Sequence, residues 1–283
     1  MILVTGASGQ LGRLIVSHLI KRGTPANQIV AAVRSPEKVQ DLASQGVIVR
    51  QADYNDSASL RAAMEDVERV VLVSSSEVGQ RTPQHKNLIQ AAKDANVELL
   101  AYTSILDAQN SPLALAAEHV ETEQALLESG VPHALLRNGW YSENYTGTVG
   151  MAIEHGAVLG SAEEGKYATA ARADYAEAAA VVITSDNQAG KVYELAGDKS
   201  FTLAEYAQKV SQISGTKVVY QNLPGAEYAK VLVQVGLPEG FAAVLANSDV
   251  GASKGGLFND SKTLSTLIGR PTTPIDESIK AVL

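Results

Sequence analysis

Three glycines near the start of the chain are spaced as in a turn that binds phosphate. Gly6, Gly9 and Gly12 lie between an apolar run at residues 2–4 and an amphipathic stretch at residues 11–19. Such a pattern is informative where a strand leads into it and a helix follows. There, the first glycine permits a tight turn, the second lets backbone amides approach a pyrophosphate, and the third lets the helix pack closely.

We predict that this turn binds the pyrophosphate of a dinucleotide, because backbone amides at a helix N-terminus point at the anion and the helix dipole favours negative charge. The residues expected to form this part of the site are Gly6, Ala7, Ser8, Gly9, Gln10 and Leu11. The alternative that the sequence leaves open is a tight turn with no ligand.

The residue after the second predicted strand bears on the choice of dinucleotide. Folds that bind NAD place Asp or Glu about 20 residues after the glycines, where the carboxylate bonds the ribose 2′-hydroxyl. Here that position holds Arg34. A guanidinium forms paired, charge-assisted hydrogen bonds with a phosphate, so the sequence favours NADPH. In the alternative, Arg34 is a solvated charge that stacks on the adenine, and either cofactor remains possible.

A run of hydroxyls ends the fourth predicted strand. The residues are Ser74, Ser75 and Ser76. Ligands of open α/β sheets lie at the carboxyl ends of the strands, so we expect these serines to bond the riboses and phosphates of the cofactor. Alternatively, their hydroxyls satisfy backbone groups at the end of the strand.

The segment after the sixth predicted strand is dense in aromatic and amide side chains. Loops held by a rigid scaffold often carry function, and this one is expected to arrive beside the nicotinamide. We predict that Asn138 bonds the nicotinamide carboxamide, and that Tyr141 and Trp140 offer flat surfaces to a ring-shaped substrate. Asn138 and the backbone that follows it are thus expected at the cofactor. The alternative is hinge packing between two lobes.

The acid–base group of short-chain dehydrogenases is missing. Those enzymes use a tyrosine with a lysine four residues later, and no Tyr-x-x-x-Lys occurs in this chain. The corresponding helix contains His119 instead, and a histidine is able to donate a proton near neutral pH. We therefore name His119 and Tyr141 as candidate catalytic residues, Tyr141 through stacking on the substrate. In the alternative, His119 is a structural residue of the helix whose hydrogen-bonding groups are satisfied.

The elements that must position these residues alternate regularly in the first half of the chain. Six strands are expected, each followed by a helix, at residues 2–4, 28–33, 47–49, 69–74, 99–103 and 133–137. This alternation is typical of an α/β fold with a Rossmann-type, doubly wound parallel sheet. We assign residues 1–145 to an NADP-binding domain.

Beyond residue 145 the rhythm changes to helices separated by short strands, at residues 192–196 and 218–221. We assign residues 146–283 to a smaller α/β lobe on the substrate side, interleaved with the sheet. Its glycine-rich segment 249–256 is expected to be a loop able to move.

Length and charge exclude several classes of protein. The chain has 283 residues, 45% of them hydrophobic, no cysteine and a net charge of −8. Because a negative protein is not attracted to nucleic acid or to an anionic membrane, neither is expected as a partner. No apolar run approaches the length of a membrane span, and the first strand leaves no room for a signal peptide. We expect a cytoplasmic monomer or homodimer, without disulfides, thiolate metal sites or any other metal centre.

Three longer segments carry a resemblance that the glycines alone do not. These are SSSEVGQR at residues 74–81, LRNGWYSENY at residues 136–145 and DVGASKGGLF at residues 249–258. Together with TGASGQLG, they resemble the bacterial type 2 NAD(P)H:quinone oxidoreductases, NmrA-like members of the atypical short-chain dehydrogenases/reductases that are related to a triphenylmethane dye reductase. The resemblance implies an NADPH-binding reductase of quinones that uses no flavin. It also implies that the cofactor is bound by residues 6–11, Arg34, residues 74–76 and the segment Asn138, Gly139, Trp140, Tyr141, Ser142 and Glu143.

The function expected from the sequence is therefore reduction of a small-molecule quinone by direct hydride transfer from NADPH. An electrophilic quinone needs no strong general acid, which agrees with the missing tyrosine–lysine pair. One alternative is a sensor of the NmrA-like type that binds NADP(H) without turnover and signals to a partner. Another is a reductase of triphenylmethane-type dyes, since the acidic charge does not oppose a cationic substrate. A sugar epimerase is least favoured, because its mechanism needs the tyrosine.

Overall fold

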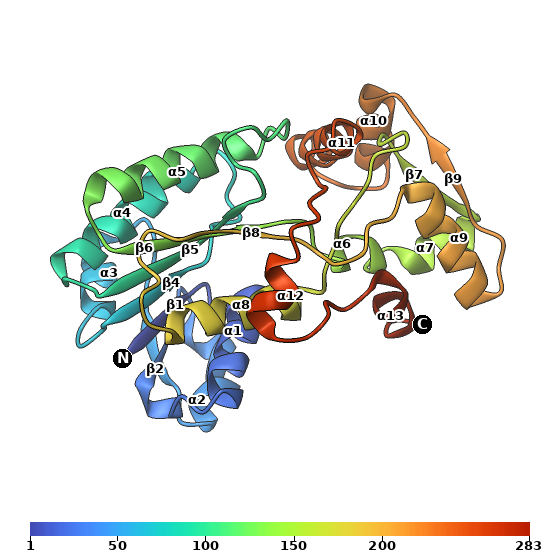
Figure 1. Cartoon of the computed structure of the whole chain (residues 1–283). Coiled ribbons are helices and arrows are strands. Elements are labelled where there is room, and N and C mark those ends of the chain that lie inside the picture. Colours follow the sequence, from blue (N-terminus) through green and yellow to red (C-terminus); the bar gives the residue numbers. More distant parts are fainter. The chain divides into compact units, whose positions relative to one another are not determined.

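The structure, a computed structural model, describes residues 1–283 and is built around one large sheet. Seven strands form it in the order β3-β2-β1-β4-β5-β6-β8, and β7 and β9 form a separate pair (Figure 1). The strands are β1 (Ile2–Thr5), β2 (Ile29–Val33), β3 (Ile48–Gln51), β4 (Arg69–Leu72), β5 (Leu99–Ile105), β6 (His133–Asn138), β7 (Ala157–Gly160), β8 (Val192–Leu195) and β9 (Val219–Asn222). The predicted α/β fold with a doubly wound parallel sheet is confirmed, and β8 adds a seventh strand to it.

Helices lie on both faces of this sheet. Figure 1 shows α3, α4 and α5 over one face and α1, α2 and α8 over the other. The helices are α1 (Gln10–Lys21), α2 (Gln40–Ser44), α3 (Ser57–Ala63), α4 (Arg81–Asp94), α5 (Ala116–Ser129), α6 (Glu143–Thr146), α7 (Val149–His155), α8 (Arg172–Thr184), α9 (Leu203–Ser214), α10 (Gly225–Gln234), α11 (Glu239–Ser253), α12 (Thr263–Ile268) and α13 (Ile275–Lys280). None of them is both long enough and apolar enough to cross a lipid bilayer.

Burial explains why the central strands read as continuous apolar runs. Every residue of β2 and of β5 is buried, as expected for strands covered on both faces. The pairs β1–β2, β1–β4, β2–β3, β4–β5 and β5–β6 are all parallel, with Ile2 opposite Ile29 and Arg69 opposite Leu99. From β1 the strand order proceeds outward to β3 on one side, and from β4 to β8 on the other. Ligands of such sheets bind at this reversal, which places the ends of β1 and β4 at the expected site.

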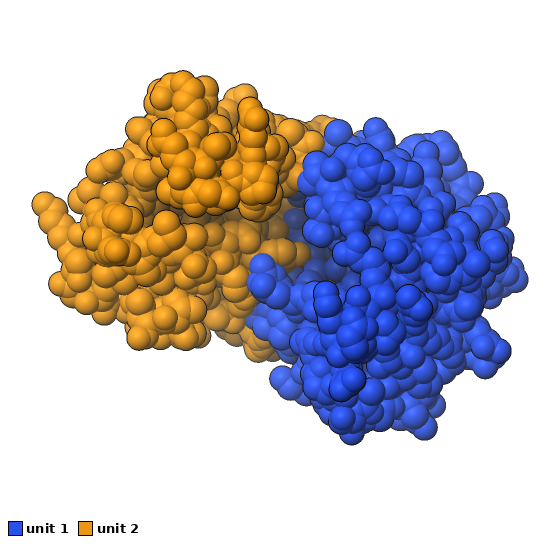
Figure 2. Space-filling view, turned by 180° about the vertical axis from the view of Figure 1, so that it is seen from behind, with its two compact units in different colours: residues 1–105, 117–138, 172–193 blue, residues 106–116, 139–171, 194–283 orange.

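The chain divides into two compact units, shown in different colours in Figure 2. Unit 1 comprises Met1–Ile105, Ala117–Asn138 and Arg172–Tyr193. Unit 2 comprises Leu106–Ala116, Gly139–Ala171 and Glu194–Leu283. The first two segments of unit 2 begin directly after β5 and β6, so the chain leaves the sheet for unit 2 at the carboxyl ends of strands.

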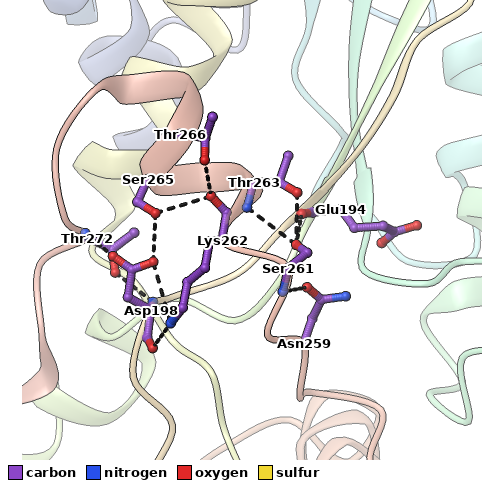
Figure 3. Close-up of polar contacts among 9 residues, drawn as sticks. All are labelled: Glu194, Asp198, Asn259, Ser261, Lys262, Thr263, Ser265, Thr266 and Thr272. Atoms are coloured by element: carbon purple, nitrogen blue, oxygen red, sulfur yellow. Dashed lines mark hydrogen bonds and ion pairs between the residues drawn. The ribbon is translucent and has the colours of Figure 1, made fainter.

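Within unit 2, a polar network holds the segment that ends in α12 (Figure 3). The Asp198 carboxylate accepts hydrogen bonds from the Ser265 hydroxyl at 2.7 Å and from the Thr272 amide at 2.9 Å. Lys262, which has a left-handed backbone with φ of +59°, donates to the Asp198 carbonyl. Burial acts to raise the pKa of Asp198, but these hydrogen bonds and the Lys262 ammonium bring it below its ordinary value. These hydrogen bonds thus hold in place a segment that is not part of any β-strand.

The prediction of a mobile loop at residues 249–256 is wrong for its first half. Helix α11 continues to Ser253, and Ala242, Ala246, Asp249 and Ala252 are all buried. This spacing places them on one face of a helix, and burying that face outweighs the cost of about 1 kcal/mol for glycine inside a helix. The glycine content of the segment therefore gave a misleading signal.

Candidate functional site

Backbone geometry accounts for two of the three glycines in the first turn. Gly6 has a φ of +59°, in the left-handed region that favours glycine. A Cβ on Gly12 would lie 2.4 Å from the Gly6 carbonyl oxygen, so only glycine lets α1 begin this close to the turn. The turn is closed by the Gly9 amide, which donates to the Gly6 carbonyl at 2.9 Å. The loop has the shape that the spacing predicts, while cofactor binding stays a prediction.

The N-terminus of α1 suits an anion. Gly9, its N-cap, has no side chain to cap the helix, and no acidic residue lies in the first turn. The first N–H groups of a helix have no partner inside the helix, and the dipole favours negative charge there. Ser8 and Gln10 are exposed, and the Gln10 side chain accepts a hydrogen bond from Arg172. Ala7 and Leu11 are buried beneath the turn.

Arg34 is exposed at the end of β2 and forms an ion pair. Its guanidinium donates to the Glu77 carboxylate at 2.7 Å, with 65% of the Arg34 side chain exposed. The second oxygen of Glu77 accepts from Gln84 Nε2, also at 2.7 Å. An arginine has five N–H donors, so this contact leaves donors for a phosphate. Arg34 is therefore positioned by Glu77 and not blocked by it.

The three serines after β4 have different environments. The Ser74 amide donates to Thr103 Oγ1 and the Ser75 amide to His85 Nε2, both at 2.9 Å. Other side chains thus satisfy the amides of Ser74 and Ser75. The Ser75 hydroxyl accepts from the Glu77 amide at 3.2 Å, which agrees with the structural alternative for this residue, and Ser76 is exposed. The hydroxyl of Ser76 is the most accessible of the three for a ligand.

Helix α5 supports the segment that follows these serines. The two carboxylate oxygens of Glu118 accept hydrogen bonds from the amides of Gly79 and Arg81, each at 3.0 Å. Arg81 in turn donates through Nε to the Ser75 carbonyl at 2.5 Å. These contacts hold residues 75–81 against α5. A spacing rule in the sequence does not reveal them, because they join residues almost forty positions apart.

His119 lies inside this support and is only 6% exposed. Arg81 can only donate, so His119 Nε2 accepts its contact at 3.4 Å. Nδ1 of the neutral ring then carries the proton and donates to the Tyr102 hydroxyl at 2.7 Å. Burial, with the charge of Arg81, lowers the pKa of His119 to about 3. These contacts favour the alternative of a satisfied helix histidine over a proton donor.

Asn138, at the end of β6, has a side chain with one polar atom that lacks a hydrogen-bond partner. The residue is 5% exposed, and its side-chain oxygen has no hydrogen-bond partner. A buried polar atom without a partner is uncommon, and leaving it so costs free energy. A carboxamide N–H donor would satisfy this oxygen. The partnerless oxygen of Asn138 therefore fits the predicted contact with the nicotinamide carboxamide.

The remaining predicted cofactor residues, 139–143, follow in unit 2 and lead into α6. Tyr141 bridges to Ala170, and the Ser142 amide donates to the Ala170 carbonyl at 2.9 Å. The Ser142 hydroxyl is within 2.9 Å of Thr169 Oγ1. Glu143 begins α6, while Gly139 donates to the Leu195 carbonyl at 2.7 Å. The segment is thus held by backbone pairing within unit 2.

Unit 2 also contains a cavity of about 540 Å³. The first of its lining residues in the sequence is Trp140, two residues after Asn138. Four aromatic side chains line it together with aliphatic ones, and the aromatic ones are Trp140, Tyr145, Tyr206 and Tyr228. Tyr141, the predicted stacking residue, is not in this lining. A cavity of this size and character suits a ring-shaped organic molecule. Trp140 lines the cavity, while contact of Trp140 or Tyr141 with a substrate stays a prediction.

Among the lining residues of this cavity that sequence reasoning missed, Asp249 is a buried acid. It is 7% exposed and accepts hydrogen bonds from the Tyr167 hydroxyl at 2.7 Å and the Ser161 amide at 2.9 Å. Burial raises the pKa of Asp249, while these two donors act in the opposite direction. Asp249 is the first residue of the segment 249–258 and its only acidic residue, which could have marked it as a candidate site residue. The glycines of the segment led instead to its assignment as a loop.

Comparison with known proteins agrees with this geometry. The sequence profile of the NmrA-like family matches residues 1–281. Quinone oxidoreductase 2 of Escherichia coli strain K12 is 58% identical over 279 residues, 99% of this chain and 97% of that protein. A crystal structure of the NADPH-dependent quinone oxidoreductase from E. coli, complexed with NADPH, has a TM-score of 0.97 at 57% identity and covers 100% of this chain and 99% of that one. Triphenylmethane reductase of Citrobacter sp., complexed with NADP(H), has a TM-score of 0.95 at 38% identity, with 100% of both chains covered.

Proposed function

Because the chain belongs to the NmrA-like family and is a close homologue of an NADPH-dependent quinone oxidoreductase over nearly its full length, we propose that it reduces quinones with NADPH. The observation that carries the proposal is the 58% identity to the E. coli enzyme across 99% of the chain. The resemblance stated from the sequence is confirmed by the same comparison. Reduction without flavin, by direct hydride transfer, is the mechanism we propose.

Unit 1 supplies the residues proposed to hold the cofactor. The amides at the start of α1 receive the pyrophosphate, Arg34 the 2′-phosphate and the serines after β4 a ribose or phosphate. The partnerless oxygen of Asn138 accepts from the carboxamide and so fixes the orientation of the nicotinamide ring. NADPH, when bound, supplies the hydride.

The substrate side is proposed to be residues 146–283, and the cofactor side residues 1–145, as expected from the sequence. Asn138, proposed to orient the cofactor, and Trp140, the first aromatic residue of the cavity lining, are two positions apart in the chain. Orientation of two reactants in one site is itself a large part of catalysis. Tyr141 stays a proposed stacking residue.

Protonation of the product is proposed to come from water. His119 is neutral, buried and bonded on both ring nitrogens, so it holds no proton ready for transfer. We further propose a cytoplasmic location and a monomeric or homodimeric state, the latter to be measured by light scattering after gel filtration.

The experiment that tests this function is NADPH oxidation by the flavin-free protein, followed by absorbance with and without a simple benzoquinone. We expect saturable turnover that depends on the quinone and exceeds the uncatalysed reaction. Tight NADPH binding with no turnover on quinones or dyes would contradict the proposal and favour the sensor alternative.

Reduction of triphenylmethane-type dyes is a second candidate. It is supported by the 38% identity to the Citrobacter reductase and by the buried carboxyl of Asp249 in the cavity, which suits a cationic substrate. The same assay with a cationic dye in place of the quinone tests it.

A further inference from the structure

The cavity of unit 2 has an unusual distribution of charge. Apart from its tyrosines, its lining contains two titratable side chains, Asp249 and the exposed His155, and no lysine or arginine. Asp249 has no cationic partner among the ion pairs of the structure, and its two hydrogen bonds come from neutral groups. An ionised carboxylate is seldom buried without a cation, because removing it from water is costly.

The hydrogen bonds to Asp249 leave capacity for a ligand. A carboxylate offers about four acceptor positions, and Tyr167 and the Ser161 amide use two of them, one on each oxygen. The donors also fix the carboxyl group in place on α11. It is therefore a pre-positioned negative group at the wall of the cavity.

Aromatic rings surround the same space. Trp140, Tyr145, Tyr206 and Tyr228 all line it, and the Tyr145 and Tyr206 rings are 5.6 Å apart. The faces of such rings attract cations, most strongly where water is excluded. A carboxylate combined with several aromatic rings is the arrangement that recognises a quaternary or delocalised organic cation.

We infer that the cavity of unit 2 is a binding site for organic cations, with Asp249 as the residue that selects positive charge. The inference goes beyond the proposed quinone reduction and does not require it, because a cation that cannot be reduced should also bind. Neutral rings enter the same cavity through apolar contact alone, so the preference for charge is what Asp249 adds.

The chain provides its own reporter for a test. Trp140 is its single tryptophan and lines the cavity, so ligand binding is followed directly by tryptophan fluorescence. The probes are benzyltrimethylammonium and its neutral isostere neopentylbenzene, which have nearly the same shape. With the full-length protein, with and without NADPH, we expect the cation to bind about tenfold more tightly than the isostere.

Substitution then assigns the preference to one residue. In Asp249→Asn the cation should lose its advantage over the isostere. The matched control is Asp260→Asn, which removes the same charge from an exposed position of unit 2 outside the cavity and should keep the advantage. If Asp249→Asn fails to fold, Tyr228→Leu, which removes one ring of the lining, should reduce the preference.

Equal binding of the two probes by the unaltered protein, or binding of neither, would overturn the inference without any variant. A preference that survives in Asp249→Asn would overturn the role of this residue. Quinone-dependent NADPH oxidation is measured separately, so failure of the cation site and failure of the proposed reductase activity are distinguishable.

Discussion

At the scale of single residues, the pairing of Arg34 with Glu77 sets the local electrostatics of the proposed 2′-phosphate site. The contact is 2.7 Å long but largely exposed, and exposed pairs of this kind contribute about 0.2–1 kcal/mol. A phosphate that binds Arg34 through two charge-assisted hydrogen bonds gains more than this. Arg34 is therefore able to keep Glu77 nearby and still favour a phosphorylated ribose.

Replacing Arg34 tests the choice of cofactor. We expect Arg34→Asp to raise the KM for NADPH by about tenfold or more, because the new carboxylate repels the 2′-phosphate. The KM for NADH, which lacks this phosphate, should change little. Initial rates with each cofactor measure both constants. Arg22→Asp, the same change at another exposed position of unit 1, is the control, and an equal rise for both cofactors in Arg34→Asp would contradict the assignment.

At the scale of elements, α4 and α5 meet through two buried histidines. The Ser75 amide donates to His85 Nε2, so Nδ1 carries the proton and donates to Thr122 Oγ1 at 2.9 Å. Burial and the charge of Arg81 lower the pKa of His85 from an ordinary 6.5 to about 3, as they do for His119. Both rings are needed in the neutral form, because protonation would place an N–H where each ring now accepts.

From this interface we predict that the folded protein loses stability in mild acid. In the unfolded chain both histidines bind protons as the pH falls below about 6.5, whereas the folded state resists protonation until about pH 3. The free energy of unfolding should therefore fall between these values, by at most about 2.7 kcal/mol per pH unit for two protons. Urea unfolding between pH 7 and about pH 5, above the range of most carboxyls, measures it. A free energy of unfolding that is flat over this range would contradict the neutral assignment.

At the scale of the whole molecule, the division into interleaved units limits how the chain can be cut. Unit 1 needs Arg172–Tyr193, which contains α8, and α8 packs along α1. A fragment of residues 1–145 lacks this helix, so the apolar side chains that α8 covers in the whole chain become exposed to water. Burying such side chains contributes about 1.5–3 kcal/mol each.

We therefore expect the fragment of residues 1–145 to be unfolded or insoluble when produced alone. The same fragment mixed with a separately produced chain of residues 146–283 should recover helical circular dichroism and NADPH binding. Cooperative thermal unfolding of the isolated fragment would contradict the interleaved division.

Much of this fold was accessible from local patterns. The glycine turn, the apolar strands and the alternation with helices depend on residues near each other in sequence, and here they predicted the parallel sheet correctly. Asp249 shows the limit. Local glycine content suggested a loop there, whereas burial against residues far away in the sequence makes a helix.

The candidate site divides in the same way. Gly6, Arg34 and Asn138 are found because each lies at or just after the end of a strand, and the ends of parallel strands gather at one edge. The support of Ser75 by His85 and of Gly79 by Glu118 joins a loop to two helices, and the cavity is lined by side chains from seven helices and strands. Periodicity in the sequence does not reveal contacts between distant elements. The burial of His119 and its structural role are therefore seen only in the structure.

The exits of the chain from the sheet have a consequence for how such proteins diverge. Leu106–Ala116 and Gly139–Ala171 are insertions after β5 and β6, and they leave the strands that precede them complete. The second insert supplies the part of the cavity wall from Trp140 to Leu159, so mutations and length changes there alter the wall while the glycine turn and the strands stay intact. Proteins that share one inherited cofactor unit are thus able to acquire new substrates through sequence changes in the inserted segments. Reductases of quinones and reductases of dyes are two results of such divergence.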